Sequence, residues 1–239
     1  MALKGEAVHL VEVCGKPGCP VCTLTRDEMD RYFDHMLYES VNDEELRARL
    51  RASWGFCNRH AHSFVKVIGG SVGIAVIYQD VLTNLLRALD GAQWQDGGWR
   101  RQGSGARSLV DKLKPRHPCV GCVHQRETER AYARALVKYL GDERAAPELA
   151  AAFAGSDGLC WRHLRMALAC VRRPGTFETL VNVQQAAWER LRAELAEFIR
   201  KNDYRFRDEA MGPEGDSWMR AIRRVAGEPG FGGAEDRDG

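Results

Sequence analysis

The sequence has no apolar segment long enough to cross a membrane. Its most apolar stretch, residues 67–77, contains three glycines and is much shorter than the roughly 20 residues of a transmembrane helix. Lys4 and Glu6 interrupt the N-terminal region before the apolar segment of a secretory signal could form. We therefore expect no membrane association and a cytoplasmic location, where cysteines stay reduced.

The chain also lacks an excess of charge of either sign. It has 35 basic and 33 acidic residues, and its formal net charge is only +2. Proteins that bind nucleic acids usually carry a strongly basic face, and basic residues interleaved with aromatic ones are missing here as well. The composition therefore argues against nucleic acid as a partner.

Two further absences concern chemistry and fold. No phosphate-binding loop, dinucleotide fingerprint, HExxH motif or Ser-His-Asp order is present, so the sequence leans against an enzyme without deciding the question. No segment alternates apolar and polar residues with the period of two that a half-buried strand requires. We therefore expect an all-α protein.

What the chain does contain is a pair of cysteine motifs that occurs twice. A Cys-x-x-Cys segment begins at Cys19 and again at Cys119, 100 residues later. A Gly-φ-Cys-x-Arg-His segment, in which φ is apolar, occupies residues 55–60 and returns at residues 158–163. Because the offsets of 100 and 103 residues are nearly equal, they indicate an internal repeat.

Each half thus carries three cysteines and one histidine with the spacing of metal ligands. A tight turn lets both thiolates of a CxxC pair face one ion, and residues three apart on a helix face the same way. Closed Cys3His sets are typical of structural zinc. We expect one site in each half, the first formed by Cys19, Cys22, Cys57 and His60 and the second by Cys119, Cys122, Cys160 and His163.

The sequence leaves the identity of the cofactor open. Two Zn²⁺ ions fit Cys3His sets, whereas two [4Fe–4S] clusters could use the same ligands and would suit electron transfer. Redox-active dithiols are a third possibility, although the thioredoxin-like βαβ pattern that surrounds such pairs is absent. Buried apolar cysteines with hydrogen-bonded histidines are a fourth.

Several residues near the motifs need an interpretation of their own. Arg59 and Arg162 each precede the motif histidine, and we expect them to donate hydrogen bonds to the thiolates from outside the ligand set. Cys14 and Cys170 occupy non-equivalent positions, and we expect small buried side chains there. Three flanking histidines without counterparts in the other half are weaker ligand candidates, namely His62, His117 and His124.

Apolar residues at helical spacing organise the chain into two tandem four-helix units, each closed by a metal site. We expect residues 1–18 to be a short lead-in, Asn42 to cap a helix, and a long helix to span residues 71–89. The expected domains are a first metal-binding repeat, a linker with a short helix, a second repeat, a C-terminal clasp or lid and a disordered tail, over residues 1–90, 91–114, 115–201, 202–226 and 227–239.

The segment after the second repeat carries a dense set of polar side chains. It could fold as a lid over a pocket between the halves or as a salt-bridged clasp on the last helix, and we favour the clasp. The residues concerned are Asp203, Arg205, Glu209, Glu214 and Trp218.

The duplicated motifs and this tail together resemble an uncharacterised bacterial family, known as a domain of unknown function. In the tail the resemblance lies in Lys201-Asn202-Asp203-Tyr204-Arg205-Phe206, Glu209, Glu214, Ser217-Trp218 and Arg220-Ala221. It covers the chain to about residue 226, although the second CxxC has Val120-Gly121 where the first has the expected Pro20 after its first cysteine. Since the family has no established activity, the resemblance implies an architecture rather than a function.

These observations predict a metal-binding helical protein with two Cys3His sites, zinc being the favoured metal. We expect an accessory or binding protein whose partner is an unidentified protein or small molecule. The alternative is an iron–sulfur or thiol-dependent oxidoreductase or electron-transfer protein.

Overall fold

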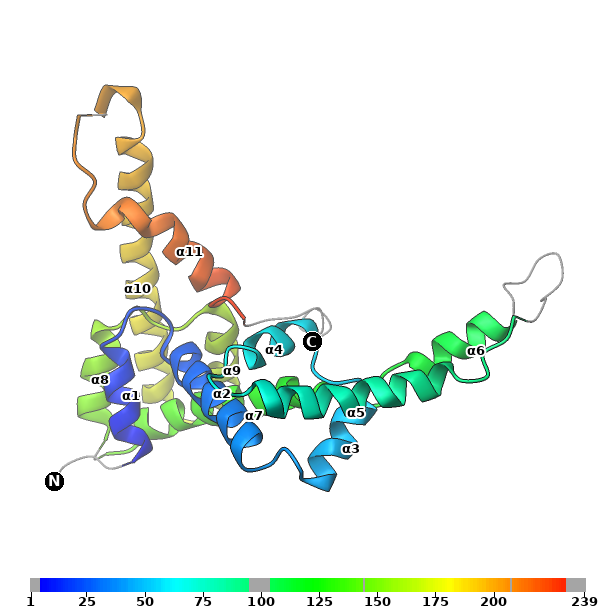
Figure 1. Ribbon diagram of the computed structural model, residues 1–239. Coiled ribbons are helices and arrows are strands. Elements are labelled where there is room, and N and C mark those ends of the chain that lie inside the picture. The colour runs from blue at the N-terminus through cyan, green and yellow to red at the C-terminus, as the bar shows by residue number, and fades with distance from the viewer. Residues whose placement is uncertain (1–4, 95–103, 144, 207, 231–239) are drawn as a thin grey trace. The chain divides into compact units, whose positions relative to one another are not determined.

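The computed structural model describes residues 5–94, 104–143, 145–206 and 208–230, and every regular element in these ranges is helical (Figure 1). The prediction of an all-α protein is therefore confirmed. The α-helices are α1 (Glu6–Cys14), α2 (Pro20–Tyr38), α3 (Glu44–Ala52), α4 (Asn58–Phe64), α5 (Ser71–Leu89), α6 (Ser104–Leu113), α7 (Val120–Leu140), α8 (Ala146–Gly155), α9 (Trp161–Cys170), α10 (Pro174–Lys201) and α11 (Ser217–Ala226). Two short 3₁₀ helices, η1 (Tyr204–Phe206) and η2 (Pro213–Asp216), lie between α10 and α11 in the sequence.

The chain forms two compact units that do not coincide with the expected repeats. The terminal unit consists of Met1–Asp27 and Glu127–Gly239, and the central unit consists of Glu28–Arg126. Helix α2 therefore starts in the terminal unit and ends in the central one, whereas α7 starts in the central unit and ends in the terminal one. Neither compact unit therefore corresponds to one of the two expected repeats.

Aromatic side chains fill the core of the central unit. The ring of Phe33 on α2 lies 5.6 Å from that of Phe56 and 5.4 Å from that of Phe64, measured between centroids. Helix α3 packs on α5, where Asp80 accepts a hydrogen bond from Nε of Arg47 at 3.0 Å. The packing of these distant segments fixes the positions of α4 and α5 within the unit.

Two helix boundaries in the central unit test the sequence analysis directly. Helix α5 spans residues 71–89, as we expected. The cap of α3 is Asp43 rather than Asn42, and its carboxylate accepts a hydrogen bond from the amide of Leu46 at 2.7 Å. The prediction of Asn42 was wrong because Asp43 directly precedes the first helical residue and so reaches the third amide of the helix.

The core of the terminal unit joins an N-terminal helix to a helix from the second half of the chain. Helix α1, which we expected to be only a lead-in, is a helix with one buried face that packs on α8 (Figure 1). Leu149 and Phe153 of α8 are fully buried. The buried residues of α1 recur at helical spacing, and this is the signal that the sequence analysis missed: Ala7, Leu10, Val13 and Cys14.

The C-terminal segment returns along α10, a helix of 28 residues (Figure 1). Helix α11 packs on α10 and α9. Of the predicted disordered tail, residues 231–239 lie outside the described residues, and so does the 95–103 part of the predicted linker. Glu228, which falls within the predicted tail, is buried at 9% exposure.

One helix in the described ranges, α5 (residues 71–89), is long and apolar enough to span a membrane, whereas the sequence analysis considered only residues 67–77 and expected no such segment. A core helix of a soluble protein can have the same length and hydropathy, so these two properties are weak evidence for a membrane-spanning helix. Ile77 and Val81 of α5 are buried in the central unit.

Candidate metal centres

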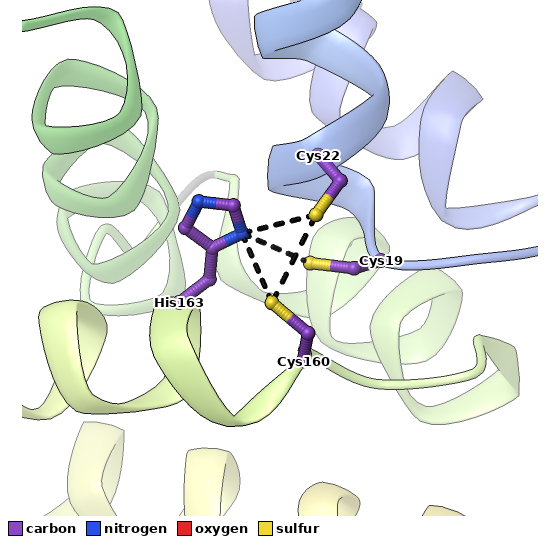
Figure 2. Close-up of side chains that lie close together, drawn as sticks. All are labelled: Cys19, Cys22, Cys160 and His163. Atoms are coloured by element: carbon purple, nitrogen blue, oxygen red, sulfur yellow. Dashed lines mark hydrogen bonds between the residues drawn. The ribbon is translucent and has the colours of Figure 1, made fainter. Parts of the chain in front are cut away.

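The first cluster of ligands, here called site A, lies in the terminal unit. It consists of Cys19, Cys22, Cys160 and His163, which converge from the starts of α2 and α9 (Figure 2). Nδ1 of His163 lies 3.4, 3.3 and 3.3 Å from the sulfurs of Cys19, Cys22 and Cys160, and the sulfurs of Cys22 and Cys160 are 3.8 Å apart. All four side chains are buried, with at most 1% exposure.

The second cluster, site B, lies in the central unit and has the same composition. It consists of Cys57, His60, Cys119 and Cys122. Nδ1 of His60 lies 3.3, 3.7 and 3.4 Å from the sulfurs of Cys57, Cys119 and Cys122, and the sulfurs of Cys57 and Cys122 are 3.6 Å apart. Cys57 and Cys122 are only half-buried, so site B is nearer to solvent than site A.

The pairing of the motifs differs from the one that we expected. Each CxxC pair meets the cysteine–histidine segment of the other half, so Cys19 and Cys22 do not share a site with Cys57 and His60. The reason is that α2, with 19 residues, runs about 28 Å from its start, whereas the returning α3, with nine residues, covers about 14 Å. Helices α7 and α8, with 21 and 10 residues, repeat this mismatch.

A glycine with left-handed backbone leads into each cysteine–histidine segment. Gly55 and Gly158 have φ angles of 83° and 71°, a region that favours glycine. Two residues further on, Cys57 and Cys160 are the N-caps of α4 and α9. The histidine follows within the first helical turn, so this motif positions two of the four ligands locally.

Each CxxC pair lies where a long helix begins. Cys19 and Cys119 directly precede α2 and α7, and Cys22 and Cys122 lie in the first turns of these helices. The N-terminus of a helix carries partial positive charge, which stabilises a thiolate over a thiol. The helix starts thus favour the ionised form that binds a metal.

The pKa values of the residues in site A are shifted in opposite directions. Hydrogen bonds from Cys19 and Cys22 lower the pKa of Cys160 far below that of a free thiol, while the hydrogen bond with Cys160 is the largest cause that raises the pKa of Cys22. Burial lowers the pKa of His163, but hydrogen bonds to Cys160 and Cys19 outweigh burial and raise this pKa to about 10. A cation that enters the site therefore has to displace protons from Cys22 and His163.

Site B shows the same division between two of its cysteines. The hydrogen bond with Cys122 lowers the pKa of Cys119 to about 3, and a hydrogen bond with His60 acts in the same direction against the effect of burial. The hydrogen bond with Cys119, followed by burial, raises the pKa of Cys122. Cys119 is thus the thiolate of this site at neutral pH, even without a cation.

The surroundings of His60 fix its orientation in site B. Nε2 of His60 donates a hydrogen bond to Oε1 of Gln125 at 2.9 Å, which leaves the lone pair of Nδ1 facing the sulfurs. Arg59 Nη2 lies 3.9 Å from Sγ of Cys122, as expected of a donor to a thiolate. Gly121 makes room for the ring, because a Cβ at this position would lie 2.8 Å from Cγ of His60.

In site A a carboxylate occupies the corresponding position behind the histidine. Oε1 of Glu129 lies 3.9 Å from Nε2 of His163, and Glu129 has no exposed surface. Arg162, which we expected beside the thiolates, donates to Oε2 of Glu129 from Nε at 3.1 Å and from Nη2 at 2.7 Å. The arginines of the two motifs therefore differ: Arg59 faces a sulfur, and Arg162 neutralises the buried acid behind the histidine.

Gln125 and Glu129, which both lie on α7, were not among the site residues predicted from the sequence. Each is a polar residue that is buried, at 4% and 0% exposure. Buried polar residues need partners, so their position on a helix that begins with a CxxC pair was the available signal. Without the correct pairing of the motifs, however, neither could be assigned to a site.

The two remaining cysteines are not ligands. Cys14 is 3% exposed in the core of the terminal unit, and burial, followed by the charge of Cys19, raises its pKa to about 12. Cys170 is half-buried and packs against the same core. Cys14 is thus the small buried side chain that we expected, and Cys170 is only partly so.

The three flanking histidines also lie outside both clusters. His124 stacks on Tyr32 with 3.9 Å between ring centroids, and its Nε2 lies 4.0 Å from Oε1 of Glu28. His62 lies in the last turn of α4, and His117 lies just before the second CxxC pair.

Ion pairs connect the C-terminal segment to α10. Glu209 pairs with Arg200 at 2.5 Å, and Glu214, which is 6% exposed, pairs with Lys201 at 2.6 Å. Both acids thus tie the segment to the end of α10. Of the other candidate residues, Asp203 and Arg205 pair with each other at 2.6 Å, and Trp218 is 48% exposed.

Two hollows in the described residues lie apart from both clusters. One hollow of about 560 Å³ lies beside Cys170 and is lined by Arg134, Lys138, Arg172 and Arg173 among others. A second of about 510 Å³ is lined by residues of α3, α5 and α6 together with Trp54 and Arg116. None of the eight ligand residues lines either hollow.

The fold and the two clusters define an all-helical protein with two candidate Cys3His metal centres. The chain belongs to a family of unknown function (DUF6062), which matches residues 8–230. It is also similar to an "Uncharacterized 23.9 kDa protein in xynA 3'region" from Caldicellulosiruptor sp. (strain Rt8B.4), with 29% identity over 221 residues that cover 91% of this chain and 99% of the relative. No solved structure matches the chain. The resemblance drawn from the motifs is confirmed.

Proposed function

We propose that the protein binds two Zn²⁺ ions, one in each cluster, and that both ions are structural. The observation that carries the proposal is the spacing of the ligand atoms, which all lie within 4.8 Å of one another in each site. A tetrahedral zinc with Zn–S bonds of about 2.3 Å has sulfurs about 3.8 Å apart. The S–S distances of 3.8 Å in site A and 3.6 Å in site B fit one ion at the centre of each set.

The same spacing argues against the alternative of two four-iron clusters. In such a cluster each cysteine binds a different iron atom, so the four ligand atoms have to surround the whole cluster rather than one ion. Ligand atoms in van der Waals contact leave no room for four irons and four sulfides. An electron-transfer role that depends on these clusters is accordingly disfavoured.

A structural role fits the closure of the sites better than catalysis does. A catalytic zinc needs an open coordination position for water or substrate, whereas each set here supplies four Cys or His ligands. Site A is fully buried, and no residue of either site lines the two hollows described above. We infer an accessory or binding protein in which the ions stabilise a scaffold.

What the ions would stabilise follows from the segments that they join. In site A, Cys22 and Cys160 are 138 residues apart, and in site B, Cys57 and Cys122 are 65 apart. Each ion thus ties the start of one helix to the start of another in a distant part of the chain. Since such a site does not exist in the unfolded chain, the free energy of metal binding contributes to folding.

Metal analysis of protein purified without oxygen tests the proposal. We expect two zinc equivalents per chain and a colourless solution, and we expect Co²⁺ substitution to give the intense visible bands of tetrahedral cobalt–thiolate sites. The matched controls are Cys14→Ser and Cys170→Ser, which should retain both equivalents. A brown protein with iron and acid-labile sulfide would establish the cluster alternative instead, and a metal-free protein with full helicity would refute both.

A further inference from the structure

The hollow of about 560 Å³ has a cationic lining. It lies in the terminal unit between the end of α7 and the start of α10, and we call it the α7–α10 hollow. Arg134 and Lys138 line it from α7, where residues four apart share a helix face. Arg172 and Arg173 line it from the segment that joins α9 to α10. Cations from two elements thus converge on one cavity.

Neighbouring side chains do not neutralise this charge. None of the four cations forms an ion pair with another residue that the structure describes. Nη1 of Arg173 donates a hydrogen bond to the carbonyl oxygen of Gly141 at 2.7 Å, which joins the two walls of the hollow. Asp142 supplies the one carboxylate in the lining, and its Oδ1 accepts a hydrogen bond from the amide of Ala145 at 3.0 Å. The positive charge is therefore open to a ligand.

A buried hydroxyl group also belongs to the lining. Thr176 in the first turn of α10 is 6% exposed, and its hydroxyl has no hydrogen-bond partner among the described residues. Gly141 leaves room for this group, because a Cβ at position 141 would lie 3.1 Å from Oγ1 of Thr176. Buried polar groups are normally paired, so an unpaired hydroxyl at a cationic hollow indicates that a ligand with acceptor oxygens completes the site.

We propose that the α7–α10 hollow binds a small compound that carries a diphosphate group. The lining has four cationic side chains and one carboxylate, which leaves a surplus of three positive charges. Two phosphate groups carry about three to four negative charges near neutral pH, whereas a single phosphate carries about two at most. Three of the four cations are arginines, whose planar guanidinium groups donate paired hydrogen bonds to phosphate oxygens. The volume lies within the range of about 300–1,000 Å³ for small-molecule sites.

A small anion fits the distribution of charge better than a nucleic acid does. A nucleic acid strand needs a basic track along the surface, whereas the net charge of this chain is only +2 and the four cations surround one cavity. The second hollow is basic as well, but Arg51 in its lining already pairs with Asp80 at 2.8 Å. No metal-cluster residue lines the α7–α10 hollow, so the proposal is independent of the ions that fill sites A and B.

Calorimetric titration of the full chain with inorganic pyrophosphate tests the proposal. We expect one bound pyrophosphate per chain, and the double variant Arg134→Gln, Lys138→Gln should weaken binding at least about tenfold, because it removes two charge-assisted hydrogen bonds. Arg87→Gln is the matched control, since it removes an exposed cation from the second hollow and should leave the affinity unchanged. Circular dichroism and zinc content check that the variants keep their helices and ions. No binding, full binding by the double variant, or an equal loss in Arg87→Gln would overturn the proposal.

The thiol of Cys170 reports where the ligand binds, because this half-buried side chain lines the hollow. Saturating pyrophosphate should slow the alkylation of Cys170 by iodoacetamide, which mass spectrometry of peptides measures residue by residue. The double variant should need at least about tenfold more pyrophosphate for the same protection. Cys14, which is 3% exposed and lies outside the lining, is the internal reference for a general change in stability. Binding without protection of Cys170 would place the ligand elsewhere and refute the proposal.

Competition at Cys170 distinguishes the sources of the diphosphate group. ADP that protects at lower concentration than pyrophosphate would indicate a nucleotide, and the reverse order would indicate a smaller diphosphate; both orders support the proposal. Orthophosphate should protect only at a concentration at least about tenfold higher, because it engages fewer of the cations. Orthophosphate that protects as well as pyrophosphate would contradict the diphosphate assignment. A single-stranded oligonucleotide that displaces pyrophosphate from the hollow would assign it to nucleic acid and overturn the proposal.

Discussion

Replacing the ligands in pairs decides which motifs share an ion. With the sites as the structure has them, Cys22→Ser and Cys160→Ser disable one and the same site. The double variant should therefore keep one of two metal equivalents, as each single variant does. Cys22→Ser combined with Cys57→Ser disables both sites and should keep none. A pairing by sequence halves predicts the opposite outcome for the two double variants.

The same variants should differ in the part of the fold that they loosen. Structural zinc contributes an apparent free energy of about 10–16 kcal/mol in small domains, whereas a whole domain is stable by only about 5–15 kcal/mol. Even a third of the metal contribution is therefore a large fraction of the stability of one unit. Cys22→Ser should expose α8 and α9 in the terminal unit and leave α3 and α4 protected.

Two measurements check this reasoning together. Elemental analysis after gel filtration gives the metal equivalents, and hydrogen exchange followed by mass spectrometry locates the loosened helices. Cys14→Ser serves as the control, because this buried cysteine belongs to neither cluster and should retain both ions. Retention of one equivalent by the Cys22→Ser, Cys57→Ser double variant would show that the assignment of ligands to the two sites is wrong.

Two further predictions concern affinity. Gly121→Ala should weaken metal binding at site B about 10- to 100-fold, because the added methyl would lie 2.8 Å from Cγ of His60. Chelator competition measures the loss, and Gly155→Ala, which meets no atom within 4 Å, should change nothing. Metal binding at site A should strengthen with pH, because the pKa values of Cys22 and His163 are raised and both groups keep their protons at pH 7. Competition titrations at pH 7 and 8 would measure the gain, and an affinity that stays the same between these two pH values would contradict the prediction.

The eight residues that form the two clusters and most of the helices could be predicted from the sequence because their signals are local. A CxxC pair needs only a turn at a helix start, and the glycine before Cys57 or Cys160 needs only its own left-handed backbone. The apolar spacing of residues 71–89 likewise contains all the information for a long helix. Each of these features depends on residues that are close together in the chain.

The pairing of the motifs could not be predicted from spacing, because it depends on where helices end in space. Equal intervals between CxxC and cysteine–histidine segments suggested that each half closes on itself. The unequal lengths of the outgoing helix and the returning helix, 19 against nine residues, decide otherwise. Glu129 was missed for the same reason. Its proximity to His163 follows only from the three-dimensional arrangement of α7 and α9, not from the sequence.

The exchange of ligands between the halves also accounts for the presence of two sets of motifs in one chain. In each half the helix that follows the CxxC pair is about twice as long as the next helix, 19 against nine residues and 21 against 10. Each CxxC pair lies instead with the cysteine–histidine segment of the other half. Two sets on one chain thus complete both clusters, and α2 and α7 each begin at one candidate metal site and end in the core of the other unit. Neither unit can consequently be completed by one half of the chain alone.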